Sequence, residues 1–345
     1  MSQVQVVCPI GHRIHHPVHM VAGGLTRPHP DVPARVDVIA TELQRGGMAS
    51  LVDAIPATAQ EVSACHHPEY LDFLQRVCAW LADSDETSRV LGPSSFPSSR
   101  WSRRPRGLVG QAGFYSVDME TPLDRNTWEA AMWSAGAALT AARIAATKVS
   151  PAYAACRPPG HHAGRDWCGG FCYINNAAVA ASFLASLGRV GLLDIDYHHG
   201  NGTQDIFYER PDILVISIHA DPDFAYPYFC GYAEEKGRGR GQGFNHNIPL
   251  ALGATSSEYL AALDEALDRL RDFAPEYLVV SLGTDTAAGD PIGKFALTTR
   301  DFAVIGRNIS SLGTPILVIQ EGGYNLDMLG VHVSAFIGGL CQQCS

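Results

Sequence analysis

Two carboxylates and a histidine follow a strongly apolar run near the middle of the chain. The run 190–193 leads directly into Asp194, Asp196 and His198. Such a run is typical of a buried strand, and alternate strand residues point to the same face, so the three side chains are predicted to share one side. Their oxygen and nitrogen donors suit Zn²⁺ or a similar first-row ion. The segment is interpreted as a metal site, with a helix cap followed by loop histidines as the alternative.

Two adjacent histidines, His161 and His162, lie in a second segment of unusual composition. Two prolines and two glycines surround them between Arg157 and Gly164. Proline fixes φ and glycine permits tight geometry, so the segment is predicted to be a rigid turn. The imidazoles could be metal ligands, a general base with an electrostatic partner, or structural histidines held by hydrogen bonds. The residues alone leave these options open.

The elements that must position these motifs alternate between strands and helices. Short runs rich in Val, Ile and Leu lack polar alternation, which is typical of buried parallel strands. They are 3–7, 190–195, 213–219, 277–282 and 315–320, and the segments with helical spacing are 126–146, 175–186, 256–273 and 299–311. The order predicts an α/β fold with an open, mainly parallel sheet and helices on both faces.

Acidic residues gather at the expected carboxyl ends of these strands. Asp194 and Asp196 follow one run, Asp285 follows another, and Glu321 begins a Glu-Gly-Gly-Tyr sequence after a third. Ligands of open α/β sheets bind at this edge. The metal site is therefore predicted to lie at the C-terminal ends of the strands.

The composition is that of an ordinary folded protein. The chain has 345 residues, 46% of them hydrophobic and 17% charged, and no Pro/Ser/Gly-rich linker divides it, so a single domain over 1–345 is predicted. A loop at about 92–113, rich in Pro, Ser and Arg, interrupts the pattern.

The net charge of −10 argues against nucleic-acid binding, and no signal peptide or membrane span is evident, which predicts a cytoplasmic location. Nine cysteines without paired spacing favour reduced thiols.

Five motifs follow one another along the chain. They are Arg157 to Gly164, Gly169 to Ala178, Asp194 to Thr203, Leu282 to Asp285 with Asp290-Pro291, and Glu321 to Tyr324. In order and spacing they resemble the histone deacetylase superfamily, and they look closest to its bacterial acetylpolyamine amidohydrolase branch. The likeness runs from about Arg13 to about Gly339. It implies the arginase-deacetylase fold and one deacetylase-like catalytic domain.

The resemblance also implies a zinc site and a catalytic set. The zinc ligands would be Asp196, His198 and Asp285, which leaves a position for water and the substrate carbonyl. Fe²⁺ is the alternative ion in the cell. The catalytic residues would be His161, His162, Asp194, Asn201 and Tyr324.

Each catalytic residue has an implied role. His162 would act first as general base and then as acid, with Asn201 fixing its tautomer. His161 would sit beside it, with its charge stabilised by Asp194. Tyr324 would donate its hydroxyl to the carbonyl oxygen as negative charge develops there.

Binding positions follow from the same resemblance. Phe171 and Tyr226 would line a narrow tunnel that excludes bulk water, with Gly170 and His19 as further substrate-binding residues. The loop at 92–113 resembles the insertion through which the bacterial branch dimerises, so a homodimer is expected. A structural K⁺ would lie beside the zinc, held by Asp194, Asp196, His198, Ser217 and Ile218.

The chain departs from that branch around the expected mouth of the tunnel. Segment 13–19 contains histidines and no carboxylate, and segment 100–106 is basic, either for a subunit interface or for substrate selection. Both features would weaken the attraction for a polyamine. The carboxylates that remain nearby are Asp31, Asp118 and Glu120.

The leading hypothesis is a zinc-dependent amidohydrolase that cleaves small N-acyl amides such as acetylpolyamines. The alternative keeps this mechanism and changes the substrate to a neutral or xenobiotic small amide. A protein lysine deacetylase fits less well because a loop-lined mouth would obstruct the tail of a folded protein. A non-catalytic acyl-binding module would not need the catalytic residues, and a two-metal ureohydrolase would need further carboxylates.

Overall fold

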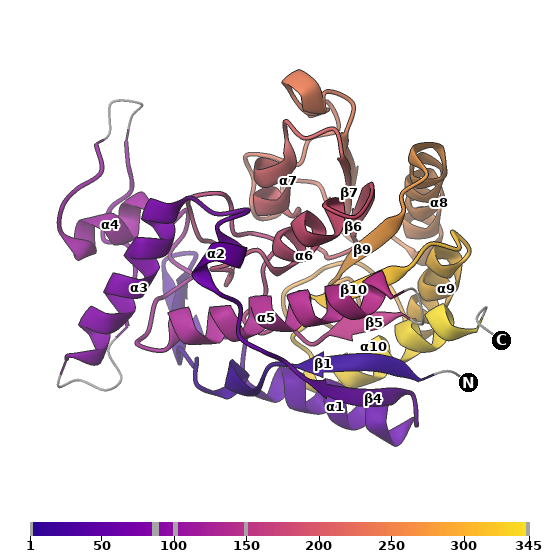
Figure 1. Cartoon of the computed structure of the whole chain (residues 1–345), viewed down its shortest axis with the longest axis horizontal. Helices are drawn as coiled ribbons and strands as arrows, with labels where there is room; N and C mark the ends of the chain where they lie inside the picture. The colour runs from indigo at the N-terminus through magenta and orange to yellow at the C-terminus, as the bar shows by residue number, and fades with distance from the viewer. Residues whose placement is uncertain (1–2, 85–89, 99–102, 148–150, 343–345) are drawn as a thin grey trace.

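In the part of the chain that the computed structural model describes, residues 3–84, 90–98, 103–147 and 151–342, eight parallel strands form the central sheet (Figure 1). Their order across the sheet is β4-β1-β5-β10-β9-β6-β7-β8. Their bounds are β1 Val4–Cys8, β4 Ala49–Asp53, β5 Ala152–Ala154, β6 Val190–Asp194, β7 Ile213–Ala220, β8 Asn245–Leu250, β9 Tyr277–Leu282 and β10 Ile316–Gln320. The predicted parallel sheet is confirmed.

Helices cover both faces of this sheet, as predicted. Their bounds are α1 Ala34–Arg45, α2 Ala59–Val62, α3 Pro68–Ala82, α4 Leu108–Phe114, α5 Thr127–Ala146, α6 Asn176–Ala185, α7 Asn201–Phe207, α8 Ser256–Phe273, α9 Thr299–Ser310 and α10 Leu326–Cys341. Alternate residues of β9 enter different cores, because Val279 packs with α5 and α6 whereas Leu278 and Val280 pack with α1, α8, α9 and α10. Continuous apolar strands are the expected result of such double coverage.

The strands that carry the acidic motifs are neighbours. β10, β9 and β6 are adjacent and parallel, so their carboxyl ends lie along one edge of the sheet. The register pairs Asp194 with Ser281. Residues far apart in the sequence therefore meet at this edge, because each follows the end of its own strand.

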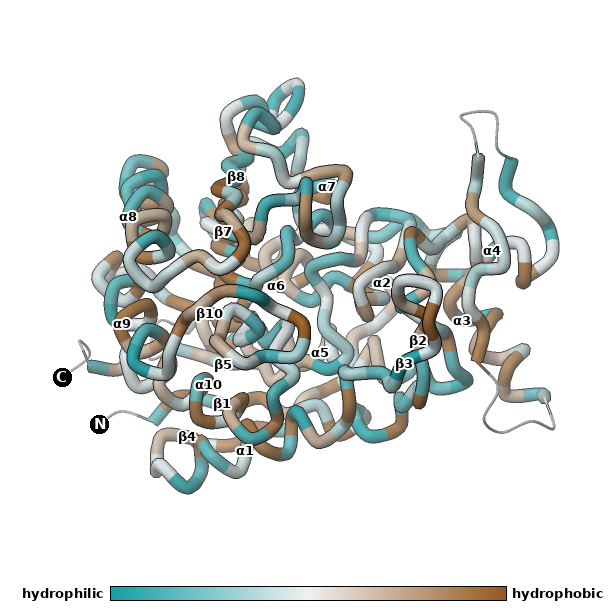
Figure 2. Tube along the Cα trace, turned by 180° about the vertical axis from the view of Figure 1, so that it is seen from behind, coloured by the Kyte–Doolittle hydropathy of each residue, from teal (hydrophilic) through white to brown (hydrophobic). Residues whose placement is uncertain are grey.

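A small antiparallel hairpin stands apart from the main sheet. It consists of β2 (His19–Ala22) and β3 (Leu25–Pro28). Figure 2 shows it at the end of the molecule that carries α3 and α4, away from α8 and α9. None of the helices in the described residues combines the length and apolarity needed to cross a bilayer.

Two glycines allow α9 and α10 to pack closely. A Cβ on Gly306 would lie 2.2 Å from the carbonyl oxygen of Phe336, and one on Gly339 would lie 2.2 Å from that of Ala303. At the neighbouring Gly338, an added Cβ would meet only the sulfur of Met48, at 3.8 Å. The first two positions therefore have no room for a side chain, whereas Gly338 has.

We expect Gly339→Ala to lower the free energy of unfolding by about 1–3 kcal/mol, because the added methyl overpacks the helix contact. Gly338→Ala is the matched control on the same helix. It should be neutral or stabilising by up to about 1 kcal/mol, because alanine has the higher helix propensity. Urea titrations of both variants measure the difference. Equal urea midpoints for the two variants would show that the contact between α9 and α10 accommodates the added methyl without loss of stability.

Candidate active site

Three metal-competent side chains meet beyond the ends of β6 and β9. Asp196 and His198 lie in the loop after β6, and Asp285 follows β9. One donor atom from each lies within 4.8 Å of the others. Both carboxylates are fully buried. The structure thus brings together the residues that the resemblance implies as zinc ligands.

Asp194 lies outside this group. Strand β6 ends at Asp194, so strand alternation does not continue to Asp196 and His198. Asp194 Oδ2 lies 2.9 Å from Nδ1 of His161, and its Oδ1 accepts a hydrogen bond from the backbone of Asp196. The expectation that alternation places Asp194, Asp196 and His198 together around the metal is corrected. Among the described residues, the third member of the group is Asp285.

The donor set fits a divalent metal ion. Oδ2 of Asp285 is buried without a hydrogen bond and lies 3.2 Å from Nδ1 of His198. A Cβ on Gly283 would lie 2.1 Å from Oδ2 of Asp196, and one on Gly322 would lie 2.5 Å from Oδ2 of Asp285, so both positions must be glycine. Burial and the charge of Asp196 raise the pKa of Asp285 to about 7. A bound cation would relieve this repulsion, and two carboxylates with one imidazole leave a coordination position open.

The adjacent histidines make different hydrogen bonds. His161 pairs with Asp194, whereas Nδ1 of His162 lies 2.7 Å from Oδ1 of Asn201 at the start of α7. The amide oxygen accepts, so Nδ1 of His162 carries the proton and its Nε2 is left free. The ring centroids of the two histidines are 4.0 Å apart.

The surrounding charges shift the pKa values of the two histidines in opposite directions. Burial opposes a charge on His161, but Asp194 and Asp196 outweigh it and raise the pKa of His161 to about 10. Burial, together with the positive charges of His161 and His198, lowers the pKa of His162 well below its ordinary value. His161 is therefore cationic and His162 neutral, a division that suits an electrostatic partner beside a proton acceptor.

A buried carboxylate without a predicted role, Glu321, holds the histidine turn. Its Oε2 accepts hydrogen bonds from the backbone N–H groups of Gly160, at 2.7 Å, and His161, at 3.1 Å. Asn175 caps α6 through its side-chain oxygen, and its amide nitrogen donates to the carbonyl of Ala163. Glu321 and Asn175 both lie in motifs identified in the sequence, and this position was the signal that could have indicated a role at the site.

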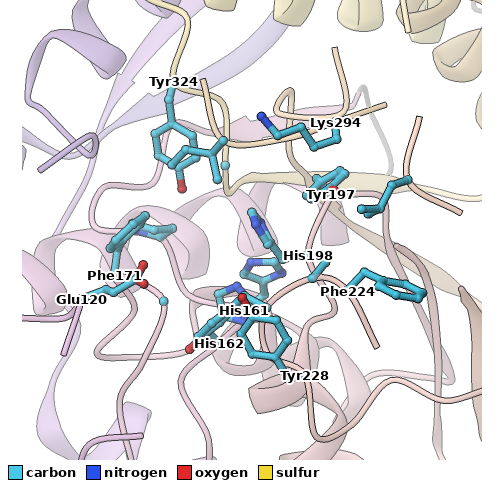
Figure 3. A pocket seen from close by; sticks show the side chains of 17 residues that line it. Glu120, His161, His162, Phe171, Tyr197, His198, Phe224, Tyr228, Lys294 and Tyr324 are labelled. Atoms are coloured by element: carbon cyan, nitrogen blue, oxygen red, sulfur yellow. The ribbon is translucent and has the colours of Figure 1, made fainter. Parts of the chain in front are cut away.

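Tyr324 approaches the histidines from the turn after β10. Figure 3 shows its hydroxyl end directed into the pocket, across from His162. Its backbone N–H donates to Oδ2 of Asp290 at 2.7 Å, and the guanidinium of Arg35 lies 4.9 Å from its ring centroid. Burial raises the pKa of Tyr324 well above its ordinary value. The hydroxyl therefore stays protonated and can donate a hydrogen bond.

His161, His162, His198 and Tyr324 line one cavity of about 310 Å³. Gly170, Phe171 and Tyr226 also line it, and a Cβ on Gly170 would lie 2.1 Å from the ring of His162. His19 does not contribute to the lining, because it lies on the β2–β3 hairpin with an exposed side chain. Three of the four predicted substrate-binding residues are thus brought together.

The turn that carries Phe171 adopts a backbone conformation that is rare for this residue type. Phe171 has a φ of 69°, in the left-handed region. Its backbone N–H donates to Oγ1 of Thr121, and that of Gly170 donates to Oδ2 of Asp118 at 2.6 Å. The same Oδ2 accepts the hydroxyl of Tyr226 at 2.8 Å. Asp118 therefore holds both the turn that carries Phe171 and the ring of Tyr226.

Of the three carboxylates expected near the mouth, Glu120 lines the cavity. Asp31 is buried in ion pairs with Arg35 and Arg157, and Asp118 is engaged as described. Burial and the neighbouring charge of Asp118 raise the pKa of Glu120 to about 7. An acidic group thus remains at the cavity wall, which weakens the argument from sequence against cationic substrates.

The residues expected around a potassium ion come from two paired strands and one loop. Asp194 ends β6, Ser217 and Ile218 lie on β7, and Asp196 and His198 lie in the loop after β6. The register of β6 and β7 places Asp194 beside Ser217, and Ile218 follows. Oγ of Ser217 lies 2.8 Å from Nδ1 of His219. The structure thus places Ser217 next to the carboxylate that contacts His161.

Comparison with known proteins agrees with this geometry. Residues 29–340 match the family described as histone deacetylase domain. The chain is 42% identical to acetylpolyamine amidohydrolase 1 of Pseudomonas aeruginosa, covering 95% of this chain and 96% of that protein. It is 40% identical to the acetylpolyamine amidohydrolase of Mycoplana ramosa, covering 98% and 99%.

A solved structure has the same fold. The crystal structure of acetylpolyamine aminohydrolase from Burkholderia pseudomallei matches with a TM-score of 0.94 at 37% identity, covering 99% of each chain. The predicted arginase-deacetylase fold is confirmed. The chain therefore belongs to the histone deacetylase family, within its branch of bacterial acetylpolyamine amidohydrolases.

Proposed function

We propose that this protein is a zinc-dependent amidohydrolase that removes the acetyl group from small acetylated amines. Membership of the family supports hydrolysis of an acetyl amide bond. The observation that carries the proposal is one cavity that is lined by a neutral His162, by Tyr324 and by His198 of the metal-competent group. Zinc held by Asp196, His198 and Asp285 would polarise the amide carbonyl and lower the pKa of a water molecule.

His162 moves the protons in this proposal. Its hydrogen bond to Asn201 presents Nε2 as the acceptor for a proton of the attacking water. The cationic His161 makes His162 a weak base that gives the proton up again, to the nitrogen of the departing amine. Tyr324 donates to the carbonyl oxygen while negative charge builds up there, and Asp290 and Arg35 keep its turn in place.

The walls of the cavity indicate the substrate. Phe171 and Tyr226 favour a slender aliphatic chain, and Glu120 provides a negative charge for an ammonium group at its far end. A small cationic acetylated amine therefore fits best. A neutral amide is the second candidate, because Phe224, Leu252 and Ile292 also line this cavity.

We also propose that K⁺ binds beside the metal site, held by Asp194, Asp196, His198, Ser217 and Ile218; the pairing of β6 with β7 supports this.

The homodimer and the cytoplasmic location stay predictions. In the basic segment 100–106, Arg100 and Trp101 lie outside the described residues. Arg104 contacts its own subunit, because its Nη1 lies 3.3 Å from Glu69 and 3.2 Å from the hydroxyl of Tyr115.

The roles of metal and base can be separated by substitution. We expect Asp285→Ala to lose both bound zinc and activity, because it removes a ligand. His162→Ala should keep its zinc while kcat falls by about 10²- to 10⁴-fold, the usual contribution of a general acid–base. Metal analysis of the purified variants and steady-state rates with N-acetyl-1,5-diaminopentane test this. A zinc-loaded His162→Ala with the wild-type kcat would contradict the assignment.

For Tyr324→Phe we expect kcat to fall by about 10²-fold or more, with KM and the thermal midpoint nearly unchanged. The ring still packs against Arg35, and only the hydrogen bond to the developing charge is lost. Rates at saturating substrate and a thermal melt of the same sample provide the measurement. Full turnover would reduce Tyr324 to a packing role.

Glu120→Gln tests the cation site. We expect KM for N-acetyl-1,5-diaminopentane to rise by about fivefold, and KM for the neutral N-pentylacetamide of the same length to change little. The pKa of Glu120 is about 7, raised by burial and Asp118 against the opposing charges of His198 and Arg27. The carboxylate is charged above this value and the substrate ammonium stays charged throughout, so the ratio of variant to wild-type KM should grow from about pH 6 to about pH 8. Equal changes for both substrates would refute a cation site at Glu120.

A further inference from the structure

The cavity contains a cationic side chain that the proposed reaction does not use. Lys294 lines the same cavity as Glu120, and its side chain is exposed. Figure 3 shows the two on different sides of the pocket, with the amine end of Lys294 on the side of Tyr324. Within the described residues, Lys294 forms no ion pair or hydrogen bond, so its charge is available to a ligand.

The backbone around Lys294 is held in place on both sides. Oδ1 of Asp290 accepts hydrogen bonds from the N–H groups of Ile292, at 2.9 Å, and Gly293, at 3.3 Å. On the other side, Phe295 is buried and packs against Tyr197 with ring centroids 4.8 Å apart. The loop therefore presents Lys294 to the cavity from a fixed position, and only the side chain is free to adjust.

The opposite charges at the cavity wall give no clear advantage to two simple kinds of substrate. A polyamine gains attraction from Glu120 but meets repulsion from Lys294 in the same cavity. A neutral amide uses neither charge. A molecule that carries both an ammonium and a carboxylate at the end remote from its acetyl group would use both charges, whereas a polyamine would bring only a like charge to Lys294.

We propose that the preferred substrates are terminally N-acetylated diamino acids, of which free Nε-acetyl-lysine is the model compound. Glu120 would receive the α-ammonium and Lys294 the α-carboxylate, while the aliphatic chain passes between Phe171 and Tyr226. Water adds to the acetyl carbon, the C–N bond breaks, and the products are acetate and the free diamino acid with its amine protonated. This inference rests on the function proposed above.

A matched pair of substrates provides the test. Nε-acetyl-lysine differs from N-acetyl-1,5-diaminopentane only by a carboxylate on the carbon that bears the free amine. We expect the zinc-loaded wild type to favour the amino acid in kcat/KM by about fivefold, the effect of one solvent-exposed ion pair. Lys294→Met should remove this preference by lowering the value for the amino acid, while the value for the diamine stays the same or rises because the repulsion is lost. Lys294→Glu should reverse it in favour of the diamine.

Lys236→Met is the control for net charge. Lys236 lies in a different groove, with its amine 3.4 Å from Nδ1 of His246, so its loss removes one positive charge away from the cavity. It should leave the substrate ratio unchanged. Calorimetric titration of the slow Tyr324→Phe protein with Nε-acetyl-lysine gives a readout of binding alone, and adding Lys294→Met should weaken this binding by a similar factor.

Four outcomes would count against the inference. A wild-type preference for the diamine, or a Lys294→Met effect that is equal for both substrates, would overturn it while leaving the proposed function intact. Loss of the preference in Lys236→Met would assign it to overall charge instead of Lys294. If the zinc-loaded protein hydrolysed neither compound, the proposed function would fail, and the inference with it.

Discussion

The site depends on burying several carboxylates close together, although burial raises the pKa of Asp285 and of Glu321 to about 7. Isolated buried charges are costly unless each is paired or hydrogen-bonded. Asp196 receives backbone N–H groups from His198 and Gly322, and Asp285 receives that of Tyr197. Glu321 is likewise held by the histidine turn, and Asp194 by the imidazolium of His161. These loops adopt their conformations because their N–H groups must point at the acids.

This requirement explains the strands and glycines around the site. Parallel strands that end side by side bring loops from distant parts of the chain to one edge. The acids can then approach one another only where the backbone has no side chains, as at Gly283 and Gly322. The metal group, the histidine turn and the tyrosine turn are therefore parts of one arrangement. A change in any of these loops alters the hydrogen bonds of the others.

The sequence predicts the interior of this fold better than its edges. Strand β9 is continuously apolar because both of its faces are covered, and its bounds are as predicted. The edge strands β4 and β8 were missed: β4 alternates in exposure, and β8 begins Asn-His-Asn and contains a proline. The interior strand β5 was missed as well, because only three residues form it. Among site residues, those in contiguous motifs were found. The structural roles of Asp118 and Glu321, and the place of Lys294 in the cavity, depend on contacts between distant loops. For the same reason the sequence does not show that His19 lies outside the lining of this cavity.

The hydrogen bonds of Asp118 have a consequence for how the cavity can change its width. One carboxylate oxygen holds the turn of Phe171 through Gly170 and also the hydroxyl of Tyr226. The two walls therefore share an anchor, and moving one of them removes a partner from the other. A broader cavity is reached more readily by replacing these residues together than by trimming one aromatic ring. Single substitutions during divergence or engineering would loosen its walls, whereas coordinated ones would reshape it.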